Sequence, residues 1–140
     1  MSTAKEQTIH LLFERMMVKN VAGMMDLMHP DAEIFDPHYP IPTMKGHVAI
    51  ERALNWAMNI IVKPGFEIRD IWEKDGRYVI ETNTHHTFKG GQSVQFDQIF
   101  RIDFEDEKIV RLHAFPPHGP PGIGGWITWL TGLIWKLKGY

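Results

Sequence analysis

Short turn signals divide the second half of the chain into four segments with strand character. Two of these turns are the dipeptides Asp75-Gly76 and Gly90-Gly91, and a third turn falls near Asp106. Turns this short join neighbouring strands as hairpins, so the strands are expected to pair antiparallel. The pattern predicts an antiparallel meander of four strands: Phe66–Lys74, Arg77–Lys89, Ser93–Glu105 and Lys108–Phe115.

Two helices are expected at the start of the chain. Thr3 and Glu6 have the spacing of a capping box, which predicts a helix that begins near Ala4. A second, short helix follows a break at Lys19-Asn20 and is ended by His29-Pro30. Apolar residues recur at helical spacing in both segments. The two stripes consist of Ile9, Leu12, Phe13, Met16 and Met17, and of Val21, Met24, Met25 and Met28.

A short strand and a third helix complete the first half of the chain. Alternation over Ala32–Asp36 predicts the strand, and the three prolines that follow make residues 37–42 a non-helical loop. The third helix is predicted from His47 to about Ile61, because Pro64-Gly65 ends the helical pattern. Helices followed by a long-stranded sheet predict an α+β fold.

Alternation along the strands separates the two faces of the expected sheet. On the third strand of the meander, Gln98 is the single polar residue of an apolar face, and Asp97 lies on the opposite face. A hairpin centred on Gly91 would pair Thr84 with Gln98. The inner face is therefore expected to be apolar with a small polar cluster, as in a small-molecule pocket. The members of this cluster are Thr82, Thr84, His86 and Gln98.

Composition argues against several classes of function. Fifteen basic and seventeen acidic residues give a net charge of -2, and without a basic block no nucleic-acid partner is expected. The chain has no Cys, which excludes disulfides, thiolate metal sites and a Cys nucleophile and suits a reducing, cytoplasmic location. Because the motifs of nucleotide-binding loops and serine hydrolases are absent, no cofactor is expected.

Three elements follow one another in the order and spacing of a known superfamily. They are the amphipathic helix pair, the segment HPDAEIFDP at 29–37 leading through the proline-rich loop to KGHVAI at 45–50, and the terminal meander. Over residues 5–116 the chain resembles the nuclear transport factor two-like superfamily, and within it the SnoaL-like polyketide cyclases and ketosteroid isomerases. The resemblance implies a cone-shaped fold, in which a strongly curved sheet wraps around the N-terminal helices. It also implies a deep apolar pocket and a homodimer formed through the sheet.

The same resemblance implies a catalytic role for Asp36. Ketosteroid isomerases carry their general-base Asp at the matching position before a Pro, where it shuttles a proton between carbons of an enolisable substrate. Their two oxyanion donors do not carry over, because the Tyr matches Phe13 or Leu12 and the protonated Asp matches Asp97 or Gln98. An authentic ketosteroid isomerase is therefore not expected. The expected catalytic groups are a base and two N–H donors to a carbonyl oxygen, namely Asp36, Gln98 and His86.

Two functions stay open for the expected pocket. One is an isomerase or cyclase that acts on a small apolar carbonyl compound, and the other is a non-catalytic module that binds a ligand or dimerises. No metal site is expected, because the adjacent His85 and His86 point to opposite faces of a strand and Asp36, His38 and His86 form no spacing motif. Asp36 also has the position of a turn cap before Pro37. The expected ligand-binding residues are Phe13, Tyr39, Leu54, Tyr78, Thr82, Thr84, Phe96, Phe100 and Leu112.

The end of the chain is expected to lie outside the SnoaL-like domain, which spans 1–116. A Pro/Gly hinge at 117–125 leads to a Trp-rich amphipathic helix at 126–140, which is too short and too often interrupted to span a bilayer. Its apolar stripe requires burial. The alternatives are packing on the chain's own sheet or on a dimer partner, covering the pocket as a lid, and peripheral contact with a membrane. The stripe consists of Trp126, Ile127, Trp129, Leu130, Leu133, Ile134 and Leu137.

Overall fold

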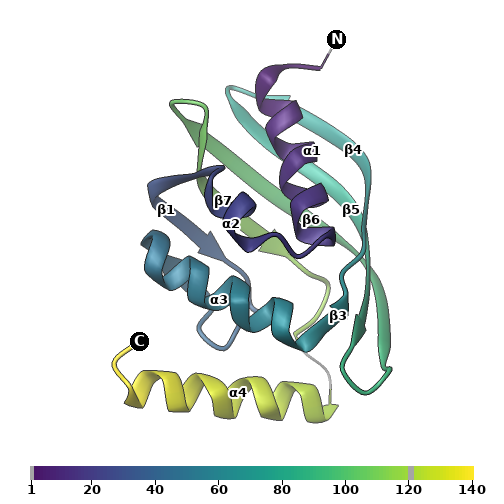
Figure 1. Cartoon of the computed structure of the whole chain (residues 1–140). Helices are drawn as coiled ribbons and strands as arrows, with labels where there is room; N and C mark the ends of the chain where they lie inside the picture. The colour runs from purple at the N-terminus through teal and green to yellow at the C-terminus, as the bar shows by residue number, and fades with distance from the viewer. Residues whose placement is uncertain (1, 120–121) are drawn as a thin grey trace.

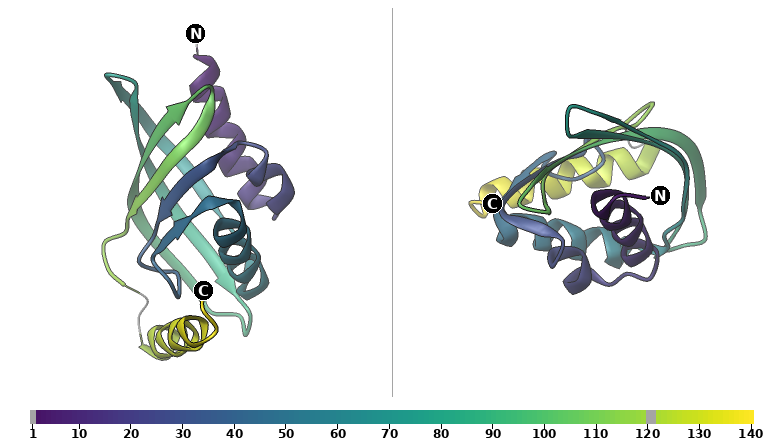
Figure 2. Two further views of the ribbon diagram at one scale, coloured as in Figure 1. Left: turned by 90° about the vertical axis from the view of Figure 1, so that its left-hand side faces the viewer. Right: turned by 90° about the horizontal axis from the view of Figure 1, so that it is seen from above.

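A curved, unclosed sheet wraps around the first helix, as the views of Figures 1 and 2 show. The computed structural model describes residues 2–119 and 122–140. The helices are α1 (Ala4–Met17), α2 (Val21–Met25), α3 (Gly46–Ile60) and α4 (Gly122–Leu137). The strands are β1 (Met28–Phe35), β2 (Thr43–Lys45), β3 (Ile61–Lys63), β4 (Phe66–Lys74), β5 (Arg77–Phe88), β6 (Ser93–Glu105) and β7 (Lys108–Phe115). The α+β fold that the sequence predicts is confirmed.

The meander β4–β7 forms the larger part of the sheet. Its strands pair antiparallel in sequence order, and the order across the sheet is β2-β1-β7-β6-β5-β3, with β4 also paired to β5. The one parallel pair among the described strands joins β1 to β7. That pairing brings the end of β1, and with it Asp36, next to the middle strands of the sheet.

The first helix begins where its capping box predicts. The Glu6 N–H donates to Thr3 Oγ1 at 3.1 Å, and the Thr3 N–H donates to Glu6 Oε2 at 2.9 Å. Its apolar stripe then packs under the sheet, where Phe13 meets Phe66 and Phe100 edge to face at centroid distances of 5.2 and 5.3 Å. This aromatic cluster joins α1 to β4 and β6, with Phe13 and Phe100 in the buried core and Phe66 packed against it.

The strand β1 begins earlier than predicted. Alternation indicated a start at Ala32, but the strand begins at Met28 and includes Pro30. The pairing of β1 with β7 is irregular between Met28 and Glu33, so Pro30, which has no N–H to donate, lies within a bulge. The second helix accordingly ends at Met25, ahead of the proline signal.

The hairpin between β5 and β6 is centred on Gly90, so the predicted register was wrong by two residues. Thr84 lies opposite Phe96, and Gln98 lies opposite Thr82. Both Gly90 and Gly91 have positive φ, which places them together in a three-residue loop that the Phe88 N–H closes through the carbonyl of Gln92 at 2.8 Å. Because side chains alternate with a period of two, this shift leaves every residue on its predicted face.

Helix α4 begins four residues earlier than the predicted Trp126 and ends at Leu137. Gly122–Gly125 of the predicted hinge are helical, since the first N–H groups of a helix need no helical partner and a Gly-rich first turn is tolerated there. Pro120 and Pro121 of the same hinge lie outside the described residues. Within the described parts of the chain, no helix is both long and apolar enough to cross a membrane.

Helix α4 packs through its less apolar side. Gly132 lies so close to the proline-rich loop that a Cβ at this position would collide with the carbonyl oxygen of Pro40. Trp135 meets Trp56 of α3 edge to face at 6.3 Å, and the Arg52 guanidinium lies 3.6 Å from the centroid of the Tyr140 ring. The helix therefore rests on α3 and the loop at 37–42.

Of the alternatives for the apolar stripe, burial on the chain's own sheet is not what the structure shows. The stripe and Ile123 face outward, and we call this exposed set the outer arc. Trp126 is 73% exposed and Leu137 is 81% exposed. The physical reason is that Gly132, which has no side chain, allows this side of the helix to approach the backbone of the loop at Pro40. The outer arc consists of Ile123, Trp126, Ile127, Trp129, Leu130, Leu133, Ile134 and Leu137.

The close approach at Gly132 gives a test of how α4 is seated. We expect Gly132→Ala to loosen the helix, because an overpacking cost of about 1–3 kcal/mol exceeds the roughly 1 kcal/mol that Ala gains in helix propensity. Hydrogen exchange of the α4 amides should become about tenfold faster. The matched control is Gly124→Ala, where a Cβ meets nothing within 4 Å. Equal protection in both variants would show that α4 does not rest on Pro40.

Candidate functional site

A cavity of about 560 Å³ lies inside the curve of the sheet. Its wall is mostly apolar and comes from α1, α3, β1, β5 and β6, and the first turns of α4 cover one side with Ile123, Gly124, Ile127 and Thr128. Helix α4 is thus a wall of the cavity, which corresponds to the lid among the alternatives for the tail. The polar side chains that reach this space come from only a few positions.

Most of the predicted site residues line the cavity. Those that do are Asp36, Tyr39, Leu54, His86, Phe96, Gln98, Phe100 and Leu112. The alternation argument for the third meander strand is confirmed, because Gln98 is buried on the cavity side and Asp97 is exposed on the other face.

Four of the predicted ligand-binding residues lie behind the wall. Phe13 is held in the core by Phe66 and Phe100, so Leu12 and Met16 are the residues of α1 that reach the cavity. Tyr78 is buried against Phe104 toward the other end of β5. The remaining two residues face inward, as strand alternation predicted, but neighbouring residues cover them completely. They are Thr82 and Thr84.

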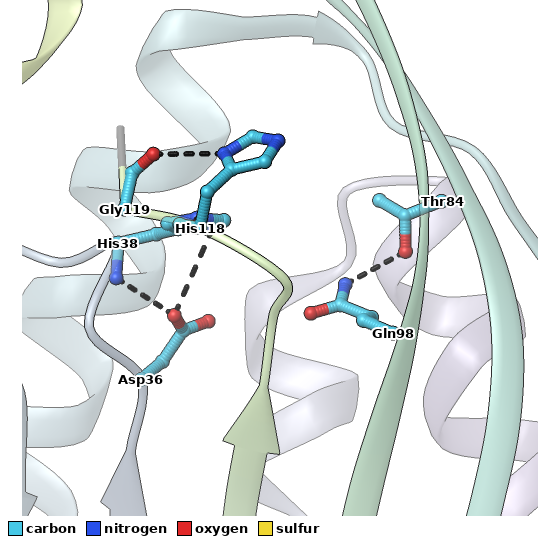
Figure 3. A network of polar contacts seen from close by, with 6 residues as sticks. All are labelled: Asp36, His38, Thr84, Gln98, His118 and Gly119. Carbon is cyan, nitrogen blue, oxygen red and sulfur yellow. Dashed lines mark hydrogen bonds and ion pairs between the residues drawn. The ribbon is translucent and has the colours of Figure 1, made fainter. Parts of the chain in front are cut away.

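Asp36 lies directly after β1 and has two roles in the structure. Its Oδ1 accepts the backbone N–H of His38 at 2.9 Å, which closes the turn at Pro37. Its second carboxylate oxygen points away from the turn, toward the side of the cavity on which Gln98 lies (Figure 3). The turn-cap role and an accessible carboxylate therefore coexist in one residue.

The ring of His38 lies near the same oxygen of Asp36, Oδ1. Its Nε2 lies 2.7 Å from the carbonyl oxygen of His118, and because a carbonyl only accepts, this nitrogen carries a proton. The opposite ring nitrogen, Nδ1, lies 4.0 Å from Asp36 Oδ1. Burial raises the pKa of Asp36, and the backbone N–H and ring of His38 offset only part of that effect. At 4.0 Å the ring nitrogen is a neighbour of the carboxylate and does not form a hydrogen bond with it.

A chain of hydrogen bonds fixes how Gln98 faces the cavity. Thr82 Oγ1 donates to the backbone carbonyl of Gln98 at 3.3 Å, so it is free to accept from Thr84 Oγ1, 3.5 Å away. Thr84 Oγ1 in turn accepts from Gln98 Nε2 at 2.7 Å (Figure 3). This order leaves Gln98 Oε1 as a buried acceptor without a partner among the described residues. Gln98 therefore uses its amide N–H on Thr84 and is left with an unpaired carbonyl oxygen, where the sequence suggested an N–H donor to a ligand.

His86 is an N–H donor at neutral pH. Its Nδ1 accepts the backbone N–H of Gly65 at 3.1 Å, so the proton of the neutral ring is on Nε2. Burial, with smaller effects from His85 and His38, lowers the pKa of His86 to about 4. The ring stays neutral at pH 7 and lies on the cavity wall.

Two cavity residues were missed as parts of the site. His38 was considered only as a possible metal ligand, and its position two residues after Asp36 was the available signal. His118 lies after the last strand, and no sequence pattern indicates that it meets His38. Tyr39 was predicted, and its pKa is raised by burial and by the charge of Asp36. No group of three or more His, Asp or Glu side chains able to hold a metal ion occurs within 2–119 and 122–140.

The raised pKa of Asp36 predicts a pH-dependent stability. In the folded protein this pKa lies above its ordinary value of 3.8, so the stabilising contribution is complete below pH 3.8 and is lost as pH rises through the folded value. Asp36→Asn keeps the acceptor for the His38 N–H and should gain stability over the wild type as pH rises. The measurement is the free energy of unfolding by urea from pH 3.5 to 7.5.

The control for this titration is Asp31→Asn, an exposed residue of β1. Its difference from the wild type should show no comparable rise over the same range. A difference for Asp36→Asn that is flat or opposite in sign would contradict the raised pKa.

Comparison with known proteins identifies the family of this chain. The model of the SnoaL-like domain matches residues 9–112. Among curated proteins, no match is found. An NTF2-like protein of unknown function from Burkholderia pseudomallei has a TM-score of 0.74 at 18% identity, over 81% of this chain and 91% of that chain.

Two similar structures hold small molecules. TerC, crystallised with polyporic acid, has a TM-score of 0.73 at 19% identity, over 81% of this chain and 92% of its own. A Mycobacterium tuberculosis protein in complex with estradiol-17β-hemisuccinate has a TM-score of 0.72 at 14% identity, over 81% and 93%. At these identities the likeness concerns the fold. The match of the family model over most of the sequence shows that the chain belongs to the SnoaL-like domain family, with the nuclear transport factor two-like fold.

Proposed function

We propose that the cavity binds a small, largely apolar molecule with a carbonyl or enolisable oxygen function, and that Asp36 exchanges a proton with this molecule. The observation that carries the proposal is the carboxylate of Asp36, which presents one oxygen to an apolar cavity while His38 holds the other. A carboxylate with a raised pKa in an apolar site is suited to general acid–base work. The activity would be that of an isomerase or cyclase without a cofactor.

Two other polar groups of the cavity wall define the oxygen chemistry of the ligand. His86 Nε2–H can donate to a carbonyl oxygen, and Gln98 Oε1 requires a donor such as a hydroxyl. A hydroxy-carbonyl compound or an enol satisfies both. TerC and the mycobacterial relative, both crystallised with small organic molecules, support a ligand site within this fold.

In the proposed reaction the ionised Asp36 removes a proton from the carbon next to the carbonyl group. The electron pair moves onto the carbonyl oxygen, where the N–H of His86 stabilises the developing charge. The protonated Asp36 then returns the proton to another carbon, so that the substrate is isomerised and the enzyme is restored.

A second function, binding without catalysis, has one observation in its favour. The donors of a ketosteroid isomerase are replaced here, since Phe13 is in the core and Gln98 presents an acceptor. Loss of one oxyanion donor commonly costs about 10²–10³ in rate. A chain with His86 as its main donor could therefore have kept the ligand site of the fold and lost turnover.

Exchange of acidic protons distinguishes the two functions. We expect the wild type to accelerate deuterium incorporation from D₂O into members of a panel of enolisable ketones, measured by proton NMR. Asp36→Asn should lower the rate by about 10²–10⁴, the usual contribution of a positioned acid–base group. The rate of the wild type should rise with pH through the raised pKa of Asp36.

Asp31→Asn serves again as the control and should keep the full rate. If none of the ketones exchanges, or if Asp36→Asn keeps the full rate, the proton transfer is wrong, and binding of the same ketones would then support the non-catalytic function.

The unpaired oxygen of Gln98 gives a second, independent prediction about binding. Between two apolar ring compounds that differ by one hydroxyl, the wild type should bind the hydroxylated compound about tenfold more tightly, because the hydroxyl pairs a buried acceptor. Gln98→Leu should abolish this preference, and Gln95→Leu, on the outward face of the same strand, should keep it. Titration calorimetry measures both, and an unchanged preference in Gln98→Leu would refute the role of Gln98.

A further inference from the structure

The outer arc of α4 is an exposed apolar surface, and only Ile123 and Ile127 among its members also line the cavity. Its members include two tryptophans, Trp126 and Trp129, which are 73% and 62% exposed. Single exposed apolar residues are ordinary on a protein surface, but contiguous apolar patches mark interaction sites. The eight members of the outer arc follow one another along a single helix and form such a patch.

Helix α4 is held on the rest of the chain by residues outside the outer arc. Helix α4 is already seated through Gly132 against Pro40 and through Trp135 against Trp56. The hydroxyl of Thr131 donates a hydrogen bond to the backbone carbonyl of Ile127 at 2.8 Å, within the helix itself. The helix thus packs the side with Gly132 and Trp135 inward and leaves its broader apolar side exposed, which is the reverse of an ordinary surface helix.

The shape of this surface favours a plane over a groove or a partner helix. At about 100° per residue, the outer arc covers roughly 160° of the helix circumference, which is wider than the seam that a single partner helix covers. Figures 1 and 2 show α4 at one end of the molecule, with the tip of the hairpin between β5 and β6 reaching nearly the same level beside it. A flat surface at this end can therefore meet the outer arc.

The positive charges near α4 favour a negatively charged surface. Lys136 and Lys138 are the charged residues of 122–140, which contains no Asp or Glu, although the whole chain is acidic. Arg52, stacked on Tyr140, adds a third positive charge at the same end of the helix. Tryptophans beside an aliphatic face, with lysines at the margin, are typical of helices that lie in the interface of an anionic bilayer.

We propose that α4 docks on an anionic lipid surface, with its axis in the plane of the membrane and the outer arc among the acyl chains. The helix does not cross the bilayer, since its 16 residues span only about 24 Å. Because Ile123 and Ile127 are also part of the cavity wall, docking would bring the cavity next to the lipid phase. The proposal does not depend on proton transfer by Asp36.

The test is flotation of the 140-residue chain with vesicles of phosphatidylcholine, with and without phosphatidylglycerol. We expect the wild type to float with the anionic vesicles, and the emission of its tryptophans to shift to the blue. The double variant Trp126→Asp/Leu130→Asp should lower the partition coefficient at least about tenfold, since it removes apolar area from the interface. Lys136→Ala/Lys138→Ala should lower it about tenfold on anionic vesicles and little on neutral ones.

A matched control separates docking from a general effect of added charge. Val48→Asp/Val62→Asp changes two residues that are 73% and 54% exposed, as Trp126 and Leu130 are 73% and 50% exposed. This variant should float like the wild type. Circular dichroism confirms that each variant is folded, and if the Trp126 variant is not, the lysine variant carries the test.

Three results would overturn the proposal. The first is a wild type that does not float with either vesicle, and the second is an equal loss in the control variant. The third is a dimer in the absence of lipid, seen by light scattering, that Trp126→Asp/Leu130→Asp dissociates, because the outer arc would then bind a second copy of the chain.

Discussion

The aromatic cluster of Phe13, Phe66 and Phe100 is the interaction on which the rest of the structure depends. It packs α1 against the inner face of the curved sheet, and Phe66 and Phe100 also form part of the cavity wall. Since this cluster fills the space between α1 and the sheet, the space beyond it can stay hollow without loss of the core. The cavity thus occupies the part of the curved sheet that the cluster does not fill. The strands that carry its polar groups are held in place by the cluster.

The strands and their faces could be predicted because their signals are local. Turn dipeptides fixed the ends of β4, β6 and β7, and the period of two correctly turned Gln98 inward. The register between β5 and β6 was missed because it depends on which loop position takes each of two adjacent glycines. Short β3, which forms only by pairing with the end of β5, has no pattern of its own.

The chemistry of the site was less predictable, because it depends on partners far apart in the sequence. Asp36 could be identified from its context before Pro37, but its environment depends on His38 and on the His118 carbonyl that holds that ring. The orientation of the Gln98 amide follows from two threonines that the sequence suggested as ligand contacts. The orientation of α4 was missed for a similar reason, since only the contact of Gly132 with Pro40 decides which side of the helix faces inward.

The central claim is that this fold keeps an acid in an apolar cavity in a state that can exchange a proton. The most direct measurement is a carbon-13 NMR titration of the Asp36 side-chain carboxyl in the ligand-free protein. The structure predicts a pKa above the ordinary value of 3.8, because burial outweighs the hydrogen bond and charge of His38. A pKa at or below 3.8 would contradict the account, since Asp36 would then be a turn cap and no more.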